Sequence, residues 1–270
     1  MTDPNWIERL PGGIARLEGI ANEVAREWGL TLGPRIPAGR YSYVALAGED
    51  AVLKVIPEED ESASQQADAL EFWSGDGAVR LLRHDPRRRV LLLERVVPGT
   101  EASAVSEEEA TTAAIGVGRR IWRKAPPAPR FPSIPDDVAR WLPDDARHPL
   151  VPAARRAYAG IRPRYDTLIH ADFHHHNVLL RGTEWVVIDP KPMVGEPEYD
   201  VPPFLWNPLG SPSTRERTER RIRAFADAGL DADRIRTWAI VRGVMLGMPS
   251  RPGPFDEATR PPLRVVRELL

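Results

Sequence analysis

The chain has 270 residues, of which 42% are hydrophobic and 28% charged, and its formal net charge is −2. This length fits one large domain or two lobes. A near-neutral chain has no overall field that attracts nucleic acid or an anionic membrane, so we expect neither partner. The sequence has no cysteine and no apolar run of about 18 residues, so we expect neither disulfides nor a membrane span, and a cytoplasmic location.

The first third of the sequence alternates short apolar runs with turn residues. Residues 14–28 have helical apolar spacing. The runs at 34–38, 41–47 and 51–57, separated by glycine-containing turns, predict an antiparallel meander. A helix over 60–74 and two further strands at 78–84 and 90–97 complete a five-stranded sheet with one inserted helix. We therefore expect an N-terminal nucleotide-binding lobe over residues 1–97.

Pro98-Gly99 predicts a sharp break, and helical spacing dominates after it. Ser106 and Glu109 form a capping-box pattern that opens a helix to about Lys124. Further helices are expected at 136–142, 150–162 and 213–248, with short strands and polar loops between 166 and 190. We assign residues 98–270 to a mainly helical C-terminal lobe that carries catalysis and substrate binding.

The densest polar motif is His-Ala-Asp-Phe-His-His-His-Asn, which begins at His170. Asp172 and Asn177 are five residues apart, and Asp189 follows at the end of an apolar run. Phosphoryl transfer from ATP needs one carboxylate to accept the hydroxyl proton, and an amide oxygen with a second carboxylate to bind Mg²⁺. The three side chains therefore predict a kinase site.

These stretches resemble the aminoglycoside phosphotransferases, specifically the group of streptomycin 6-phosphotransferases and hydroxyurea-resistance kinases. The matching segments are HADFHHHNVLL, WVVIDPKPMVGEPEYD, GDGAVRLL and LLLERVVPG, within a resemblance that runs from about residue 28 to 248. The resemblance implies an α+β, bilobal, protein-kinase-like fold. Its N-terminal lobe would be a five-stranded antiparallel sheet with a helix, and its C-terminal lobe mainly helical.

The resemblance also assigns roles to individual residues. Asp172 would be the catalytic base, Asn177 and Asp189 the Mg²⁺ ligands, and Lys54 the strand lysine that holds the α- and β-phosphates. The turn over residues 39–44 would cover the phosphates, and residues 94–97 would bind adenine through their backbone. The nucleotide-binding residues expected on this basis are Lys54, Gly39, Tyr41, Ser42, Glu94, Val96 and Val97.

Two positions depart from the family pattern. The glutamate that pairs with the strand lysine in kinases is replaced by Gln66, a neutral amide that can accept a hydrogen bond from Lys54 but cannot form an ion pair. Glu61 and Glu71 are alternative partners. The second departure is Ala171, where the group has glycine, directly before the expected base.

Other polar residues have weaker assignments. Lys191 is a candidate for phosphate or substrate binding, and Glu196, Glu198, Asp256 and Glu257 are candidate carboxylates for a cationic substrate. We expect Asp200 to anchor the catalytic loop and His170 to brace it. Four of the six histidines lie in 170–176, and we favour loop roles for them over a zinc site.

The predicted activity is that of a monomeric small-molecule kinase, moving the γ-phosphate of ATP onto a hydroxyl of a streptomycin-like aminoglycoside. One alternative is the same transfer to another hydroxylated metabolite, such as a cyclitol, sugar or nucleoside. A second is a non-catalytic nucleotide-binding protein, favoured only by Gln66 and Ala171. A protein kinase is disfavoured because no alanine-proline-glutamate segment follows Asp189.

Overall fold

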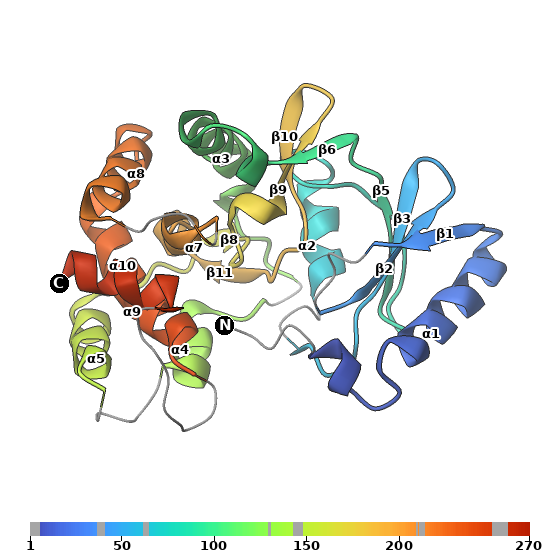
Figure 1. Cartoon of the computed structure of the whole chain (residues 1–270), viewed down its shortest axis with the longest axis horizontal. Helices are drawn as coiled ribbons and strands as arrows, with labels where there is room; N and C mark the ends of the chain where they lie inside the picture. The colour runs from blue at the N-terminus through green and yellow to red at the C-terminus, as the bar shows by residue number, and fades with distance from the viewer. Residues whose placement is uncertain are drawn as a thin grey trace.

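The computed structural model describes residues 6–36, 41–61, 65–128, 131–142, 148–208, 210, 214–249 and 259–270. Figure 1 shows an N-terminal lobe built around one sheet on one side of the molecule, and a C-terminal lobe dominated by helices on the other. No helix in the described parts of the chain is both long and apolar enough to cross a bilayer.

The N-terminal sheet has five antiparallel strands in the order β1-β2-β3-β5-β4. They are β1 (Leu32–Arg35), β2 (Tyr43–Ala47), β3 (Ala51–Val55), β4 (Leu81–Asp85) and β5 (Val90–Glu94). The predicted meander and the two further strands are confirmed, with β5 ending three residues earlier than expected. Gly48 turns the chain between β2 and β3 with a φ of 70°, a conformation that glycine adopts without strain.

Two helices flank this sheet on opposite faces, α1 (Gly13–Trp28) on the outside and α2 (Gln66–Trp73) toward the C-terminal lobe (Figure 1). The apolar stripe of α1 packs on inward side chains of β2 and β3, including Ala45, Leu53 and Val55. Because side chains alternate along a strand, Lys54 lies on the other face, toward α2. The strand therefore carries its lysine between the lobes.

The C-terminal lobe is organised around α9, which contacts six of the other helices in the described part of the chain. Its helices are α3 (Glu107–Ile121), α4 (Ile134–Trp141), α5 (Leu150–Gly160), α6 (Pro197–Asp200), α7 (Pro202–Trp206), α8 (Arg215–Asp227), α9 (Ala232–Gly247) and α10 (Pro261–Leu269). Short 3-10 turns are η1 (Ile7–Arg9), η3 (Ala102–Ala104) and η4 (His175–Asn177). The N-cap predicted for α3 is present, since Ser106 Oγ accepts from Glu109 N at 3.2 Å.

Two small antiparallel sheets line the side of this lobe that faces the N-terminal sheet (Figure 1). One has the order β10-β9-β6, with β6 (Pro98–Glu101), β9 (Val178–Arg181) and β10 (Glu184–Val187). The other has the order β11-β8-β7, with β7 (Arg123–Lys124), β8 (Thr167–Ile169) and β11 (Met193–Gly195).

The break expected at Pro98-Gly99 is wrong in one respect, because the chain continues there as strand β6. Its partner is β9, where Pro98 lies opposite Arg181 and Glu101 opposite Leu179. A pairing between segments so far apart in sequence leaves no local periodic signal. The division of the lobes between residues 97 and 98 stays a prediction.

Candidate active site

The loop between β8 and β9 begins with His170, which is fully buried. Its Nε2 lies 2.9 Å from Ile188 O, and its Nδ1 accepts from Asp172 N at 3.2 Å. Because Nδ1 accepts, the ring proton sits on Nε2 and is donated to the carbonyl. His170 thus links the start of the loop to the end of β10.

Ala171 adopts a left-handed conformation, with a φ of 59°. Its N–H donates to Asp200 Oδ1 at 2.6 Å, and its carbonyl accepts from Arg242 Nη2 at 2.6 Å. Asp200 Oδ2 also accepts from His170 N at 2.9 Å. A left-handed alanine costs about 1–2 kcal/mol. Asp200 and Arg242 therefore hold this turn on both sides. Asp200 has the position expected of a loop anchor.

Asp172 follows this turn with its side chain about one-third exposed, at 31%. Its Oδ1 lies 3.6 Å from His174 Nε2. Burial acts to raise the pKa of Asp172, but His174 and Lys191 outweigh burial and the opposing charge of Asp189 and lower the pKa below its ordinary value. Asp172 is therefore ionised at neutral pH and able to accept a proton.

Asn177 and Asp189 are brought together by a backbone bond from Ile188 N to Asn177 O at 2.9 Å. Asn177 Nδ2 donates to Asp172 O at 2.9 Å, which turns its amide oxygen away from that contact. Within the described part of the chain, neither Asn177 Oδ1 nor Asp189 Oδ2 makes a hydrogen bond. These two oxygens are the donors that a hard cation needs.

No group of three or more His, Cys, Asp or Glu side chains in the described ranges could hold a metal ion by itself. The loop histidines instead have separate partners, since His174 contacts Asp172, and His176 Nδ1 lies 2.7 Å from Glu101 Oε2. One carboxylate and one amide oxygen fit Mg²⁺, which keeps several waters and takes further oxygens from phosphates. The donor set thus fits a nucleotide-bound cation.

Lys54 extends from β3 toward the C-terminal lobe, and its Nζ lies 2.5 Å from Asp189 Oδ1. It also donates to Gln66 Oε1 at 2.8 Å. Gln66 Nε2 donates in turn to Asp189 Oδ1 at 2.9 Å and to Pro190 O at 3.0 Å. Gln66 is therefore the α2 partner of Lys54. The alternatives Glu61 and Glu71 are exposed and lie beside Arg140 and His84.

Burial acts to raise the pKa of Asp189, but the Lys54 ammonium outweighs it and holds the pKa well below the ordinary value. Asp189 also has a positive φ of 56°, which orients its side chain at the end of β10. The carboxylate is therefore fully charged between the lobes. Lys54 supplies a balancing positive charge, and the neutral amide of Gln66 adds a hydrogen bond.

Lys191 lies at the same place, with its Nζ 4.9 Å from the ring centroid of Tyr41. Burial acts to lower the pKa of Lys191, but Asp172, Asp60 and Asp189 outweigh it and raise the pKa. The backbone of Lys191 donates to His170 O at 2.9 Å. A charged ammonium therefore stands beside Asp172 and against the N-terminal lobe. Ser42, next to Tyr41, is buried, and Gly39 lies outside the described residues.

The segment expected to bind adenine follows β5. The Glu94 carboxylate accepts from Arg80 N at 2.9 Å and from Arg181 Nη1 at 2.6 Å, and Val97 O accepts from Gly182 N at 2.7 Å. The backbone N–H and carbonyl of Val96 make no backbone hydrogen bond in the described parts of the chain. Of the three candidates, Val96 thus retains both groups for a ligand.

The carboxylates predicted to bind substrate separate into two pairs. Glu196 is fully buried and accepts from Arg234 Nε at 2.9 Å and from Trp238 Nε1, while Glu198 Oε1 accepts from Asp231 N at 3.2 Å. Both are enclosed by protein, so a substrate role for them is disfavoured. Asp256 and Glu257 lie outside the described residues.

Two buried arginines of this region were not identified from the sequence, Arg242 on α9 and Arg221 on α8. Arg242 bonds the carbonyl of Ala171, and Arg221 lies against His175. The one available signal was their position, because each replaces an apolar residue in the buried stripe of its helix. A charge in such a stripe indicates a buried polar partner.

Known proteins resemble this chain over most of its length. The sequence model of a family described as aminoglycoside/hydroxyurea antibiotic resistance kinase matches residues 27–251. A streptomycin 6-kinase of Streptomyces glaucescens is 32% identical over 257 residues, which cover 86% of this chain and 82% of the relative. A hydroxyurea phosphotransferase of Kitasatospora aureofaciens is 31% identical over 258 residues, covering 88% and 72%.

Solved structures share the fold at low identity. The choline kinase LicA from Streptococcus pneumoniae has a TM-score of 0.64 and 10% identity, over 94% of this chain and 99% of that one. A thermostable mutant of aminoglycoside phosphotransferase APH(4)-Ia, in ternary complex with ADP and hygromycin B, has a TM-score of 0.61 and 19% identity, over 93% and 98%. The fold is protein-kinase-like, and the chain belongs to the aminoglycoside/hydroxyurea antibiotic resistance kinase family.

Proposed function

We propose that this protein transfers the γ-phosphate of ATP to a hydroxyl group of a streptomycin-like aminoglycoside. The observation that carries this proposal is the contact between a lysine of the N-terminal sheet and the polar residues of the C-terminal lobe. Lys54 of the sheet lies 2.5 Å from Asp189, whose neighbour Ile188 is bonded to Asn177 of the loop that bears Asp172. The side chains proposed to bind phosphate, to hold the metal ion and to act as the base thus lie in one cluster.

The nucleotide would lie between a lobe of residues 1–97 and a lobe of residues 98–270. Val96 offers its backbone to adenine, Lys54 binds the α- and β-phosphates, and the turn over 39–44, with Tyr41 and Ser42, covers them. Asn177 Oδ1 and Asp189 Oδ2 would hold Mg²⁺. The ion supplies neutralisation of phosphate charge.

Asp172 accepts the proton of the acceptor hydroxyl as its oxygen bonds to the γ-phosphorus and the bond to the β-phosphate oxygen breaks, leaving ADP. The Lys191 ammonium, held against Tyr41, stands where it can neutralise charge on the transferred phosphoryl group. The contribution of the protein is mainly positioning and charge neutralisation. Both sequence departures have a structural role here, Gln66 as a hydrogen-bond bridge and Ala171 in a clamped turn, so neither favours a non-catalytic protein.

The acceptor is proposed from the relatives, which are named for streptomycin and for hydroxyurea at nearly equal identity. A cationic aminoglycoside needs carboxylates near Asp172, and Asp256 and Glu257 remain the candidates. Hydroxyurea is a second candidate acceptor, because its hydroxyl needs no acidic cleft. We further propose that the enzyme acts as a monomer in the cytoplasm, where ATP is supplied.

The test is ADP release by the purified protein with Mg-ATP, measured alone, with streptomycin and with hydroxyurea. We expect a streptomycin-dependent rate that Asp172→Asn lowers by about 10²–10⁴-fold, the usual effect of losing a positioned base. Nucleotide affinity should be retained, because Asp172 does not bind ATP. Asp166→Asn, the same change at an exposed aspartate before β8, is the matched control and should leave the rate unchanged.

Near-wild-type turnover by Asp172→Asn would refute the assignment of the base. Stimulation by hydroxyurea but not by streptomycin would mean that hydroxyurea is the acceptor. Nucleotide binding without stimulation by either compound would exclude both acceptors and favour another hydroxylated metabolite.

A further inference from the structure

His175 lies in the middle of the catalytic loop, between Asp172 and Asn177, yet it has no part in the transfer proposed above. It is 1% exposed, and its ring stacks on Phe204 of α7 with a centroid distance of 3.8 Å and an interplanar angle of 14°. It begins the 3-10 turn η4 that ends at Asn177. The position of His175 therefore bears on where the Asn177 side chain points.

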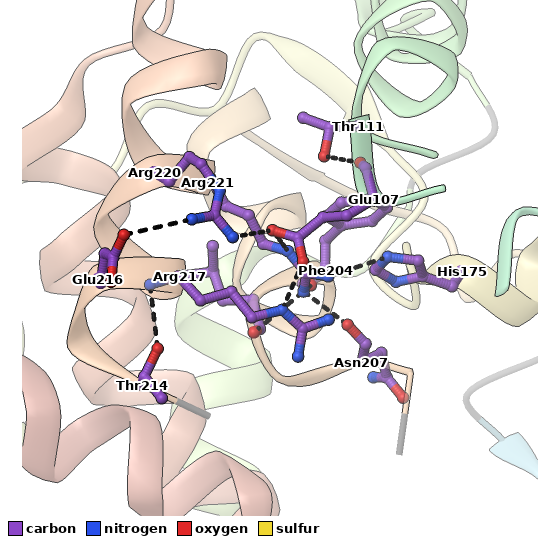
Figure 2. A network of polar contacts seen from close by, with 11 residues as sticks. Glu107, Thr111, His175, Phe204, Asn207, Thr214, Glu216, Arg217, Arg220 and Arg221 are labelled. Atoms are coloured by element: carbon purple, nitrogen blue, oxygen red, sulfur yellow. Dashed lines mark hydrogen bonds and ion pairs between the residues drawn. The ribbon is translucent and has the colours of Figure 1, made fainter. Parts of the chain in front are cut away.

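Arg221 of α8 holds this histidine from the far side (Figure 2). It is 1% exposed, and its Nη2 lies 3.4 Å from His175 Nε2. Its Nη1 donates to three carbonyls at the end of α7, those of Phe204 at 2.6 Å, Leu205 at 3.2 Å and Asn207 at 2.6 Å. These include acceptors that a helix end leaves unsatisfied. One guanidinium thus joins α7 to the catalytic loop.

The hydrogen bond between Arg221 and His175 can have only one direction. A guanidinium only donates, so His175 Nε2 must accept and the ring proton must be on Nδ1. His175 Nδ1 has no hydrogen-bond partner in the described ranges. Arg221 is therefore the polar contact that orients the ring there.

Glu107, the first residue of α3, supplies the opposing charge (Figure 2). Its Oε2 accepts from Arg217 Nε at 2.8 Å, and its Oε1 accepts from Arg220 Nη2 at 2.9 Å and lies 3.6 Å from Arg221 Nε. A buried arginine with no counter-charge would be very costly. Glu107 thus keeps Arg221 in place and ties α3 to α8.

We propose that Arg221 is a positioning residue for the metal-binding side of the active site, acting through His175 on Asn177. The steps are contiguous, from Arg221 Nη2 to the His175 ring and along two residues of one 3-10 turn to Asn177, whose Nδ2 is bonded to Asp172 O. The inference rests on the proposed function, because that assigns Mg²⁺ to Asn177. Arg221 does not contact the proposed metal ligands directly, and yet it would set the affinity for the ion.

The experiment measures binding of AMP-PNP by calorimetry over a range of Mg²⁺ concentrations, so it needs neither acceptor nor turnover. Three variants are compared with wild type: Arg221→Met, which removes the donors; His175→Phe, which keeps the stack on Phe204 and removes the acceptor; and the double variant. Arg236→Met is the matched control. Arg236 joins α9 to α8 through Glu219 at 2.7 Å and has no contact with His175.

We expect Arg221→Met to raise the Mg²⁺ concentration needed for half-maximal AMP-PNP binding by about 10-fold, as loss of a partner behind a metal ligand commonly does. His175→Phe should raise it less. The double variant should match Arg221→Met within about twofold, because both changes break one path. Amide hydrogen exchange over residues 174–178 should speed up without any ligand in both single variants, and Arg236→Met should change neither reading.

An unchanged Mg²⁺ requirement in Arg221→Met or, if that variant does not fold, in His175→Phe would overturn the proposal. Independent, multiplying effects in the double variant would also overturn it. Binding of AMP-PNP to the wild type that does not depend on Mg²⁺ would contradict the assumption that the site holds the ion together with the nucleotide, and would overturn the proposal. Mg²⁺-dependent binding without transfer to either acceptor would defeat the proposed function alone, and the comparison of variants would still decide this inference.

Discussion

Lys54 in the N-terminal lobe and Arg221 in the C-terminal lobe are both buried cations beside the catalytic loop, but their partners differ in kind. Lys54 lies 2.5 Å from the carboxylate of Asp189 and bonds the neutral amide of Gln66. Arg221 is surrounded by backbone carbonyls and an imidazole, with Glu107 as a shared counter-charge. The partner of Lys54 is itself a proposed ligand of Mg²⁺, whereas no ligand-binding role is proposed for the carbonyls and the imidazole that Arg221 contacts.

This difference suggests two separate roles. Lys54 can exchange its protein partner for a ligand, whereas Arg221 holds the surrounding structure in place. If Lys54 binds nucleotide phosphates as proposed, it can exchange part of its contact with Asp189 for phosphate oxygens at small cost, since one charged acceptor replaces another. Arg221 has no such replacement, because its carbonyl acceptors belong to α7. Three changes test the comparison, ordered here from the largest expected effect to the smallest.

Gln66→Glu tests whether the Lys54 cluster needs a neutral bridge. A glutamate would place an oxygen where Gln66 Nε2 now donates to Asp189 Oδ1 at 2.9 Å and to Pro190 O at 3.0 Å. Losing buried donors in this way costs about 1–3 kcal/mol. We therefore expect kcat/KM for ATP to fall about 10-fold or more, although glutamate is the residue that kinases use here.

Steady-state kinetics with varied ATP measure this effect. Gln65→Glu, the same change one residue earlier and outside the cluster, should leave kcat/KM unchanged. Activity of Gln66→Glu equal to or above that of wild type would show that Lys54 gains more from an ion pair than Asp189 loses.

Glu107→Gln tests the support around Arg221. Burial acts to raise the pKa of Glu107, but the hydrogen bond from Arg220 and the charges of Arg221 and Arg217 outweigh it, and the pKa lies below its ordinary value of 4.5. A carboxyl whose pKa is lowered by folding stabilises the native state above its unfolded pKa and loses that effect as pH falls through the folded value. The variant should therefore lower the free energy of unfolding by about 1–2 kcal/mol at pH 7.

Denaturant unfolding of both proteins should show this difference at pH 7 and a smaller one below pH 4.5, as Glu107 of the wild type becomes protonated. Glu216→Gln is the control, because its carboxylate is 86% exposed and 3.8 Å from Arg220, so it should have almost no effect. A difference that stays constant or grows toward acid would contradict the role given to Glu107.

The two regions also differ in how much the sequence could predict. The meander with Lys54 and the loop with Asp172 and Asn177 carry periodic or closely spaced signals, and the structure brings both together. Strands β6, β7 and β11 have two to four residues, and distant segments decide their pairing. Arg221 and Arg242 act on a loop 46 and 71 residues away, and no local pattern encodes that contact. A charged residue in an apolar helical stripe was the available hint.

Ala171→Gly has the smallest expected effect and tests why alanine is tolerated where the family resemblance predicts glycine. Glycine would relieve the left-handed conformation, worth about 1–2 kcal/mol. It would also add about 0.5–1 kcal/mol of backbone entropy cost and lose a buried methyl worth about 0.8 kcal/mol. Ala171 is 5% exposed, so both losses apply, and stability should change by less than about 0.5 kcal/mol.

The matched control is Ser74→Gly, at a second left-handed residue, with a φ of 49°, whose side chain is exposed at the end of α2. It gains the same relief without losing buried area, so it should raise the free energy of unfolding by about 0.5–1 kcal/mol. In Ala171→Gly, Asp200 and Arg242 still hold both sides of the turn, so kcat should stay within about twofold of wild type. A larger fall in kcat, with stability intact, would mean that the Ala171 methyl itself helps to place Asp172.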